Sequence, residues 1–292
     1  MYLKQICLGI IGLLFLAGLI SAQMTWQQEN EEGTLSLYDG KIPVITYRYG
    51  DQLKKGVPAQ YLRACYIHPL YGLDGTILTA DFPLDHFHHH GLFWTWPEVQ
   101  VRGQNTQTWH PANLRQHFVR WIERETSEGS AALKAEIVWK LDAKEVVARE
   151  IISLRVHPID DTGRKIDLTI LLEPVGGPMT LKGASEGNKG YGGLCLRGAG
   201  MFKGGVLTTD TGIQEKDVVN TPFKWADLST NNHGVTITVD PGHPGYPVSW
   251  LIRRGYAGIL NPSWPGLEAV TLESGAPVTL EYQILVHHGT KK

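Results

Sequence analysis

The sequence predicts an all-β protein, a large antiparallel β-sandwich. Apolar and polar residues alternate with a period of two along most of the chain, as in strands that bury one face. The 33 Gly and 16 Pro, together with nine Trp and eleven Tyr, are typical of many short strands joined by turns. No strand-like segment is followed by a helix at βαβ spacing, so a parallel sheet is not expected.

The expected strands follow this alternation in chain order. They cover residues 34–38, 41–48, 63–68, 76–79, 131–144, 146–156, 166–172, 235–239 and 278–286. Asp39-Gly40 predicts a two-residue hairpin between the first two strands, because both central residues of a type I′ turn need positive φ. Residues 131–144 contain helix formers, but Ile137-Val138-Trp139 and the strand-like run after them favour a second hairpin.

Charge and composition exclude two classes of protein. The 27 Lys and Arg against 29 Asp and Glu give a net charge of −2, so a nucleic-acid-binding surface is not expected. Charged residues make up 19% and hydrophobic ones 42%, which excludes a disordered chain.

Residues 1–22 have the features of a secretory signal peptide. Lys4 precedes an apolar run from Cys7 to Ile20, and residues 20–22 resemble a small-residue cleavage site. The run is shorter than the ~20 residues that span a bilayer. We therefore predict a periplasmic or secreted protein with no stable membrane span after removal of the signal, and a single sandwich domain over residues 23–292.

Two cysteines, Cys65 and Cys195, remain after the signal. Export permits a disulfide between them, and buried free thiols are an equal alternative.

The strongest functional signal is the segment 81–96, where four of the twelve histidines fall within five positions. In an extended segment, alternate side chains share a face. The face of interest would carry His86, His88, His90, Trp94 and Trp96, with Phe87, His89 and Phe93 on the opposite face. Imidazoles on one face would serve as Zn or Cu ligands or as a general acid or base. The alternative is a structural polar loop held by Asp81 and Asp85.

The second signal is the glycine-rich segment 183–193. It contains a Gly-x-Ser-x-Gly pattern, but a nucleophile elbow needs a helix after the serine, and the glycines at 190, 192 and 193 oppose one. A loop that presents Glu186, Lys189 and Tyr191 to a ligand is the preferred interpretation. A plain connecting loop is the alternative.

Further candidates lie toward the C-terminus. His243 either lines a site or decorates a proline-rich turn, and Asn261 and Trp264 follow as polar and aromatic candidates. Arg197, inside an apolar run, is either half of a structural ion pair or an anion-binding group.

The aromatic content fits a sugar site, because indole rings pack against the C–H faces of a pyranose while His, Asp, Glu, Asn and Arg bind its hydroxyls. Trp139 and Trp250 lie inside strand-like runs and are expected in the core. The tryptophans near predicted loops are ligand candidates, namely Trp94, Trp96, Trp109 and Trp264.

Four motifs together resemble the bacterial PmoA-like family, catalogued as methane oxygenase PmoA and largely uncharacterised. They are residues 68–70 with 74–75, residues 81–94, residues 190–193 with 196–197, and residues 280–289. A membrane methane monooxygenase subunit is a multi-spanning helical protein, which this chain is not. The resemblance implies a β-sandwich similar to the galactose mutarotase supersandwich, with a saccharide ligand.

A mutarotase-like mechanism would need a histidine acid and a carboxylate base. His88 or His90 would be the acid, and Glu186, Glu268 or Asp85 the base. His68, His86, Trp94, Trp96, Lys189, Tyr191, Arg197, His243, Asn261 and Trp264 would bind substrate.

Three hypotheses follow. The first is an exported protein that carries out acid–base chemistry on a sugar ring, with epimerisation preferred over hydrolysis and elimination. The second is a non-enzymatic carbohydrate-binding protein. The third is a metal protein that uses His86, His88 and His90. No cofactor is firmly implied, and a divalent metal is left open.

Overall fold

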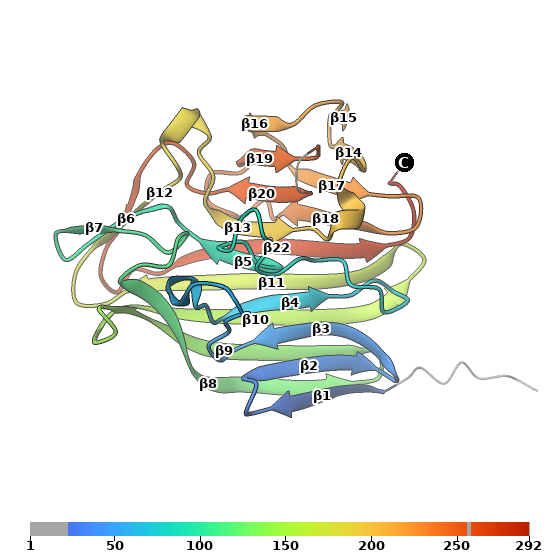
Figure 1. Ribbon diagram of the computed structural model, residues 1–292, viewed down its shortest axis with the longest axis horizontal. Coiled ribbons are helices and arrows are strands. Elements are labelled where there is room, and N and C mark those ends of the chain that lie inside the picture. The colour runs from blue at the N-terminus through green and yellow to red at the C-terminus, as the bar shows by residue number, and fades with distance from the viewer. Residues whose placement is uncertain (1–22, 256–257, 292) are drawn as a thin grey trace, which may run out of the picture.

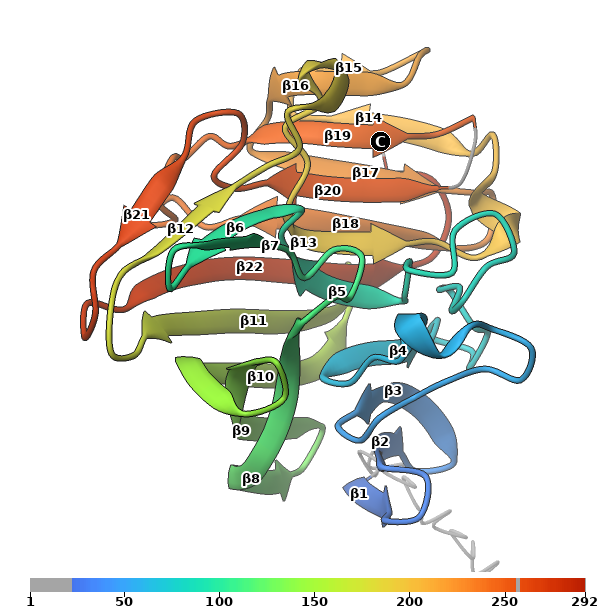
Figure 2. The same ribbon diagram turned by 60° about the vertical axis from the view of Figure 1, so that its left-hand side comes forward.

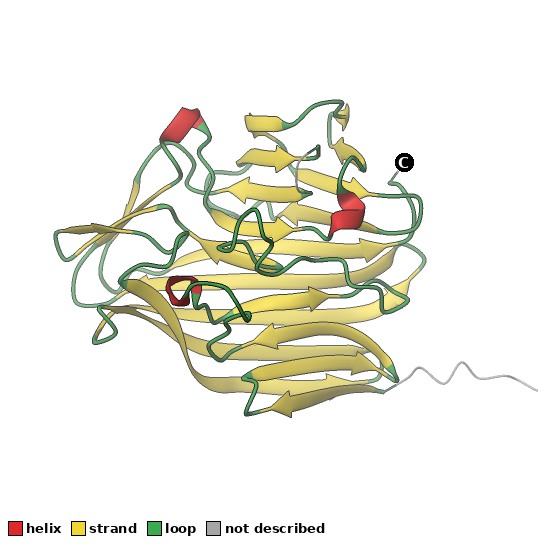
Figure 3. Ribbon diagram, viewed as in Figure 1, coloured by secondary structure: helices red, strands yellow, loops and turns green. Residues whose placement is uncertain are grey.

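Antiparallel strands account for almost all the regular structure of the chain. The computed structural model describes residues 23–255 and 258–291, and every strand pair in it is antiparallel. Figure 3 shows strands throughout and only short helical turns. The all-β prediction is therefore confirmed, whereas the predicted signal peptide lies outside the described residues.

Two nine-stranded sheets form the body of the protein, and in Figure 1 the first lies in front of the second. The first sheet, in spatial order, contains β1 (Met24–Glu29), β2 (Thr34–Asp39), β3 (Ile42–Arg48), β4 (Tyr66–Leu70), β5 (Leu92–Thr95), β13 (Gly193–Arg197), β20 (Ile259–Ser263), β19 (Ser249–Arg253) and β16 (Val218–Pro222). The second contains β15 (Gly212–Ile213), β14 (Val206–Thr209), β17 (Trp225–Ser229), β18 (Gly234–Val239), β22 (Val278–His287), β11 (Gly163–Pro174), β10 (Glu145–Asp160), β9 (Ser130–Leu141) and β8 (Leu114–Ser127).

A smaller sheet extends from one end of the sandwich, as Figure 2 shows. It consists of β21 (Val270–Leu272), β12 (Met179–Lys182), β6 (Glu98–Val101) and β7 (Gln104–Thr106). The helical turns are η1 (Ala59–Tyr61), η2 (Glu186–Asn188) and η3 (Gly200–Phe202).

The main core lies between the two large sheets. Strands β9 and β11 bury every second residue, which is the alternation that the sequence predicted. Leu35 and Leu37 of the first sheet and Leu168 and Ile170 of the second are fully buried members of one core cluster. Burial of this kind contributes roughly 25 cal/mol per Å² of apolar surface, so the core is the main source of stability.

The predicted hairpin at Asp39-Gly40 forms one residue later than expected. Asp39 belongs to β2 and pairs with Ile42, so Gly40 and Lys41 make the turn. A register shift after Leu37 places an extra residue on β3, and this bulge moves the turn.

Two predicted strands differ from the structure. The segment 63–68 becomes a strand only from Tyr66, because Cys65 has a φ of 63°, outside the β region. Residues 76–79 form no strand and make only isolated bridges, at Ile77 and Thr79. Of the two alternatives for Cys65 and Cys195, a disulfide or free thiols, the structure contains buried free thiols.

A second, smaller apolar cluster covers the outer face of the first sheet. It contains Tyr66, Phe93, Trp109, Cys195 and Ile259, with Tyr191 packed against it. Because Phe93 and Cys195 face away from the main core, this cluster gives the loops above β5 and β13 a rigid base.

Candidate functional site

A cavity of about 560 Å³ opens on this outer face. Its lining combines imidazoles, aromatic rings and charged side chains, namely His86, His88, His89, Trp109, His110, Glu186, Lys189, Tyr191, Asp217, Leu251, Arg253 and Ile259. The volume is within the range of small-molecule sites. We call it the imidazole cavity.

Three connections build the imidazole cavity above strands β19 and β20. His86, His88 and His89 lie on the connection from β4 to β5, Trp109 and His110 follow β7, and residues 186–191 connect β12 to β13. Gly91 ends the first connection, where a Cβ would lie 2.3 Å from the carbonyl oxygen of Ile67. Only glycine therefore lets this loop meet β4 so closely.

The segment 81–91 is a series of turns and not an extended strand. Alternate histidines consequently do not share a face, and the prediction that His86, His88 and His90 point together is wrong. His86 stacks on His89 with ring centroids 4.8 Å apart and an interplanar angle of 8°, and the ring of His88 lies 3.8 Å from that of His110. His90 turns away into the protein.

Arg197 holds this loop onto β13. Its Nη2 donates to both carboxylate oxygens of Asp85, at 3.0 and 2.9 Å, and its Nη1 lies 3.0 Å from Nδ1 of His89. Because a guanidinium only donates, Nδ1 of His89 must accept, and a neutral His89 carries its proton on Nε2. Of the two roles predicted for Arg197, the structure contains the ion pair.

Asp85 also contacts His86, with Oδ2 3.3 Å from Nδ1 of the ring. The side chain of His86 is 34% exposed, so a proton could pass between its ring and a bound ligand. Desolvation raises the pKa of Asp85, but Arg197 and His86 outweigh it, and the net pKa is lowered. Asp85 is therefore ionised at neutral pH and places a negative charge beside the His86 ring.

The other imidazoles of the cavity are held neutral. Burial lowers the pKa of His88 to about 2, with smaller effects from His110 and His86. Burial also lowers the pKa of His89 well below its usual value, and that of His110 as well. At neutral pH His88 and His110 offer one donor and one acceptor each, and His89 offers the donor Nε2–H because its Nδ1 accepts from Arg197, which suits hydrogen bonds to hydroxyl groups.

Trp109 and Tyr191 supply the aromatic part of the cavity, with ring centroids 4.6 Å apart. The charged side chains at the rim are paired. Lys189 lies 3.3 Å from Glu186, and Arg253 lies 3.4 Å from Asp217. Glu186, Lys189 and Tyr191 thus line the cavity together, although Glu186 is the most exposed of them.

Trp94 and Trp96 belong to the main core and not to a ligand site. Both are about 1% exposed or less. The indole of Trp94 donates to Glu150 at 2.6 Å, and that of Trp96 to the carbonyl oxygen of Trp264 at 2.8 Å. Trp94 and Trp96 lie on one face, as the alternation predicts. That face points into the main core and not toward a ligand.

His243, Asn261 and Trp264 also lie away from the imidazole cavity. Nε2 of His243 bonds the hydroxyl of Tyr282 at 2.8 Å, and Asn261 donates to the carbonyl oxygens of Gly192 and Leu194. Trp264 is 4% exposed in the main core. Their hydrogen bonds and packing are internal, so the substrate-binding interpretation does not fit them.

His90 is fully buried, and the catalytic role predicted for it is not compatible with that position. Its Nδ1 lies 2.6 Å from Oδ1 of Asp81 and must donate, because a carboxylate only accepts. Its Nε2 has no hydrogen-bond partner. Burial lowers the pKa of His90 to about 4, so the ring is neutral at pH 7.

His68 opens into a different cavity of about 300 Å³, which Asp81 also lines. Its Nδ1 bonds Thr79 Oγ1 at 2.9 Å, and burial lowers its pKa to about 4. Of the carboxylates considered as bases, Glu186 lines the imidazole cavity, Asp85 reaches it through His86, and Glu268 is exposed elsewhere.

Sequence reasoning assigned no role to two polar lining residues, His110 and Asp217, and it placed His89 on the wrong face. His110 sits directly after Trp109, so an imidazole beside an indole was the available signal. The convergence of Asp217 and Arg253 depends on the packing of β16 against β19, which no local pattern encodes.

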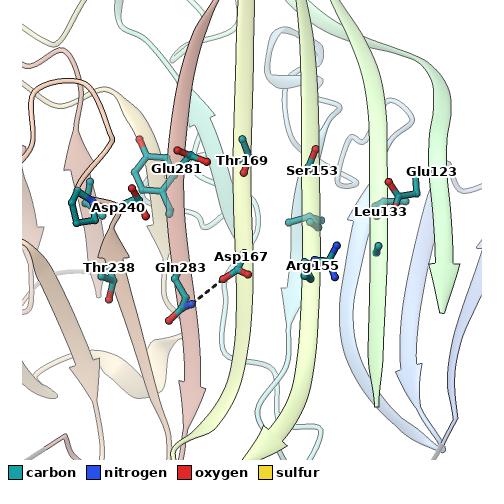
Figure 4. Close-up of a pocket in the computed structure, with 15 residues that line it drawn as sticks. Glu123, Leu133, Ser153, Arg155, Asp167, Thr169, Thr238, Asp240, Glu281 and Gln283 are labelled. Atoms are coloured by element: carbon teal, nitrogen blue, oxygen red, sulfur yellow. Dashed lines mark hydrogen bonds between the residues drawn. The ribbon is translucent and has the colours of Figure 1, made fainter. Parts of the chain in front are cut away.

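Another cavity, of about 530 Å³, lies on the outer face of the second sheet and is shown in Figure 4. Strands β8 to β11, β18 and β22 line it with polar side chains such as Glu123, Arg155, Asp167 and Glu281. Size does not separate the two cavities. The imidazole cavity is favoured because its lining brings neutral imidazoles next to the aromatic rings of Trp109 and Tyr191, with Asp85 paired to the lining residue His86.

No group of three or more His, Cys, Asp or Glu arranged to hold a metal is present within residues 23–255 and 258–291. The structure likewise contains, in the part of the chain it describes, no helix long and apolar enough to cross a membrane.

Fold and cavity together define an antiparallel β-sandwich protein with an imidazole-lined cavity on one sheet. The chain belongs to the family described as Family of unknown function (DUF6807), which matches residues 34–292. No curated protein matches the sequence.

Two solved structures are similar to this chain. Slr1438 from Synechocystis sp. PCC 6803 is 8% identical, with 94% of this chain and 99% of that chain covered and a TM-score of 0.43. A putative kojibiose phosphorylase from the human microbiome is 13% identical, with 89% of this chain and 30% of that chain covered and a TM-score of 0.33. Both scores lie below 0.5, so neither likeness carries an argument.

Proposed function

We propose that this protein binds a saccharide in the imidazole cavity and carries out acid–base chemistry on the sugar ring. Epimerisation is preferred over hydrolysis and elimination. The observation that carries the proposal is the pairing of Asp85 with the partly exposed ring of His86 at 3.3 Å, on the wall of an open cavity. We further propose that the protein is exported and acts in the periplasm or outside the cell.

The lining supports a polyhydroxylated ligand. Neutral His88 and His110 can each donate to one hydroxyl and accept from another, His89 can donate from Nε2, and the ring of Tyr191, packed against Trp109, offers surface to C–H groups. The rim charges pair with one another, so they do not demand a highly charged ligand.

His86 replaces His88 and His90 as the proposed proton-transfer group. A useful general acid or base has a pKa near the working pH, and the pKa of about 2 at His88 makes that ring a weak base. Asp85 would orient the His86 ring toward the cavity. Glu186, across the cavity, would be the second carboxylate.

The second candidate function is sugar binding without catalysis. It is favoured by the lowered pKa of His88, His89 and His110, since rings that stay neutral are better suited to recognition than to proton transfer. Measurements of sugar binding and of turnover on the same purified protein distinguish the two functions.

Isothermal titration calorimetry with a panel of monosaccharides and disaccharides tests binding. Tyr191→Ala should weaken the affinity at least tenfold, which is about 1.4 kcal/mol. Tyr38→Ala on β2, and Glu281→Gln in the cavity of Figure 4, are the controls and should leave it unchanged. If Glu281→Gln alone abolishes binding, the site is on the second sheet.

Turnover is then followed by ¹H NMR of the anomeric and ring protons. His86→Gln should lower kcat about 100-fold with little change in KM, since general acid–base groups contribute ~10²–10⁴. His233→Gln is a matched control, because His233 faces Asp74 at 3.9 Å on another surface. Binding without any turnover would leave the second candidate function.

A further inference from the structure

Behind the wall of the imidazole cavity lies a buried positive charge with no carboxylate partner. Arg63 is 6% exposed, and its Nη2 donates to the carbonyl oxygens of Thr108 and Trp109, at 2.6 and 3.1 Å. Its Nε has no hydrogen-bond partner. In the described part of the chain, no carboxylate oxygen lies within 4.0 Å of this guanidinium.

Packing places this charge directly against the cavity lining. Arg63 bonds the backbone of Trp109, which lines the cavity, and its Cζ lies 5.9 Å from the ring centroid of Phe93. The Phe93 ring lies 6.2 Å from that of His89 and 5.5 Å from that of Trp109. One layer of rings therefore separates the guanidinium from the cavity.

The field of Arg63 reaches the cavity. Burial is the main cause of the lowered pKa of His110, and Arg63 is the next. Burial also lowers the pKa of Arg63 itself, to about 10, so it remains protonated at neutral pH.

The remaining charges around the cavity cancel in pairs. These are Lys189 with Glu186, Arg253 with Asp217, Arg197 with Asp85 and Arg48 with Asp81. Beside Arg63 lies Arg115, which donates to backbone carbonyls, and Asp51 lines the same narrow gap as both arginines. Two cations and one anion leave a surplus of one positive charge.

We propose that the saccharide bound in the imidazole cavity carries one negative charge, with a uronic acid as the simplest ligand of this class. The proposal rests on the proposed function. An unpaired charge in a region of low dielectric acts over several ångströms with little screening, so it favours an anion in the adjacent cavity. The anion would complete the charge balance that the protein leaves open.

Calorimetry with matched pairs of sugars tests this without any variant. Glucuronate is compared with glucose, and galacturonate with galactose, at pH 7 in 20 mM salt. Each uronate should bind at least tenfold more tightly than its neutral partner. Glucose 6-sulfate, which carries one charge on a different group, should also bind more tightly than glucose if the field rather than a carboxylate contact is responsible.

Variants then assign the preference to Arg63. Arg63→Met should reduce the preference for the uronate to less than threefold, while Arg63→Lys should keep most of it. Arg120→Met removes an exposed arginine of β8 and is the control. Circular dichroism establishes that each variant retains the β fold.

Equal affinities, or tighter binding of the neutral sugars, would overturn the proposal and leave the proposed function intact. A preference that persists in folded Arg63→Met would overturn the role of Arg63. Binding of neither sugar in any pair would contradict the proposed function itself.

Discussion

The indole Nε1 of Trp94 donates to Oε1 of Glu150 at 2.6 Å, and this bond joins the two large sheets across the core. Trp139 and Gln116 donate to the other oxygen, at 2.7 and 2.9 Å. Glu150 has no exposed surface. Burial raises its pKa, and the three N–H donors oppose that effect.

Glu150→Gln should lower the free energy of unfolding by about 2 kcal/mol. An amide has only one oxygen, so its NH₂ group would face an N–H donor of Trp94 or of the Trp139–Gln116 pair and leave it unsatisfied. Urea unfolding at pH 7 measures the change. Glu145→Gln, on an exposed pair with Arg102, is the control and should change it by less than about 1 kcal/mol. An unchanged stability for Glu150→Gln would mean that the donors find other partners.

The sequence was sufficient for the fold but only partly for the site. Period-two alternation locates β9, β11 and β22 because each strand has one buried face, and that pattern is local. Trp94 illustrates the limit. Its indole has both a polar and an apolar part, so pattern alone could not distinguish a sugar-binding ring from one that bonds a buried carboxylate.

The histidine segment illustrates a second limit. Its density marked the site correctly, since His86 and His88 line the cavity. Its conformation was not predictable, because the turns depend on Arg197, more than a hundred residues away, and on the close approach of Gly91 to β4. Arg63 left no signal, since burial of a charge without a partner is a property of packing.

Arg197→Lys should disrupt the loop that contains His86 while keeping the positive charge. A lysine cannot donate hydrogen bonds to Asp85 and His89 at the same time, because it lacks the planar fork of the guanidinium. We expect faster amide hydrogen exchange in residues 82–90, and sugar affinity at least tenfold weaker. Arg120→Lys on the exposed pair with Glu136 is the control. Unchanged exchange in this loop would show that Arg197 does not hold it.

His89 and His90 should be opposite tautomers at pH 7. His89 accepts at Nδ1 from Arg197 and therefore carries its proton on Nε2, whereas His90 donates from Nδ1 to Asp81. Long-range ¹H–¹⁵N correlation spectra distinguish the two forms by their nitrogen shifts. Two rings of the same tautomer would contradict one of these hydrogen bonds, and Asp81→Asn identifies the His90 signals.

As the pH falls, the protein should begin to lose stability at pH values well above those at which its carboxylates titrate. Burial lowers the pKa of His90 to about 4, whereas an unfolded histidine has a pKa near 6.5. Between these values the unfolded chain binds a proton that the folded chain does not, so stability is complete above about pH 6.5 and is lost as the pH falls toward 4. His90 alone accounts for at most about 3.5 kcal/mol over that window, at ~1.4 kcal/mol per pH unit.

His68 and His243, each with a pKa lowered to about 4 by burial, and His88 act in the same direction. Glu150 acts in the opposite direction, because its raised pKa means that the folded state binds the extra proton. Urea unfolding at pH 7.5, 6.0 and 5.0 measures the balance, and Glu150→Gln removes the opposing contribution and should steepen the decline. A stability that is constant from pH 7.5 to 5.0 in both proteins would show that the buried rings are protonated at no cost.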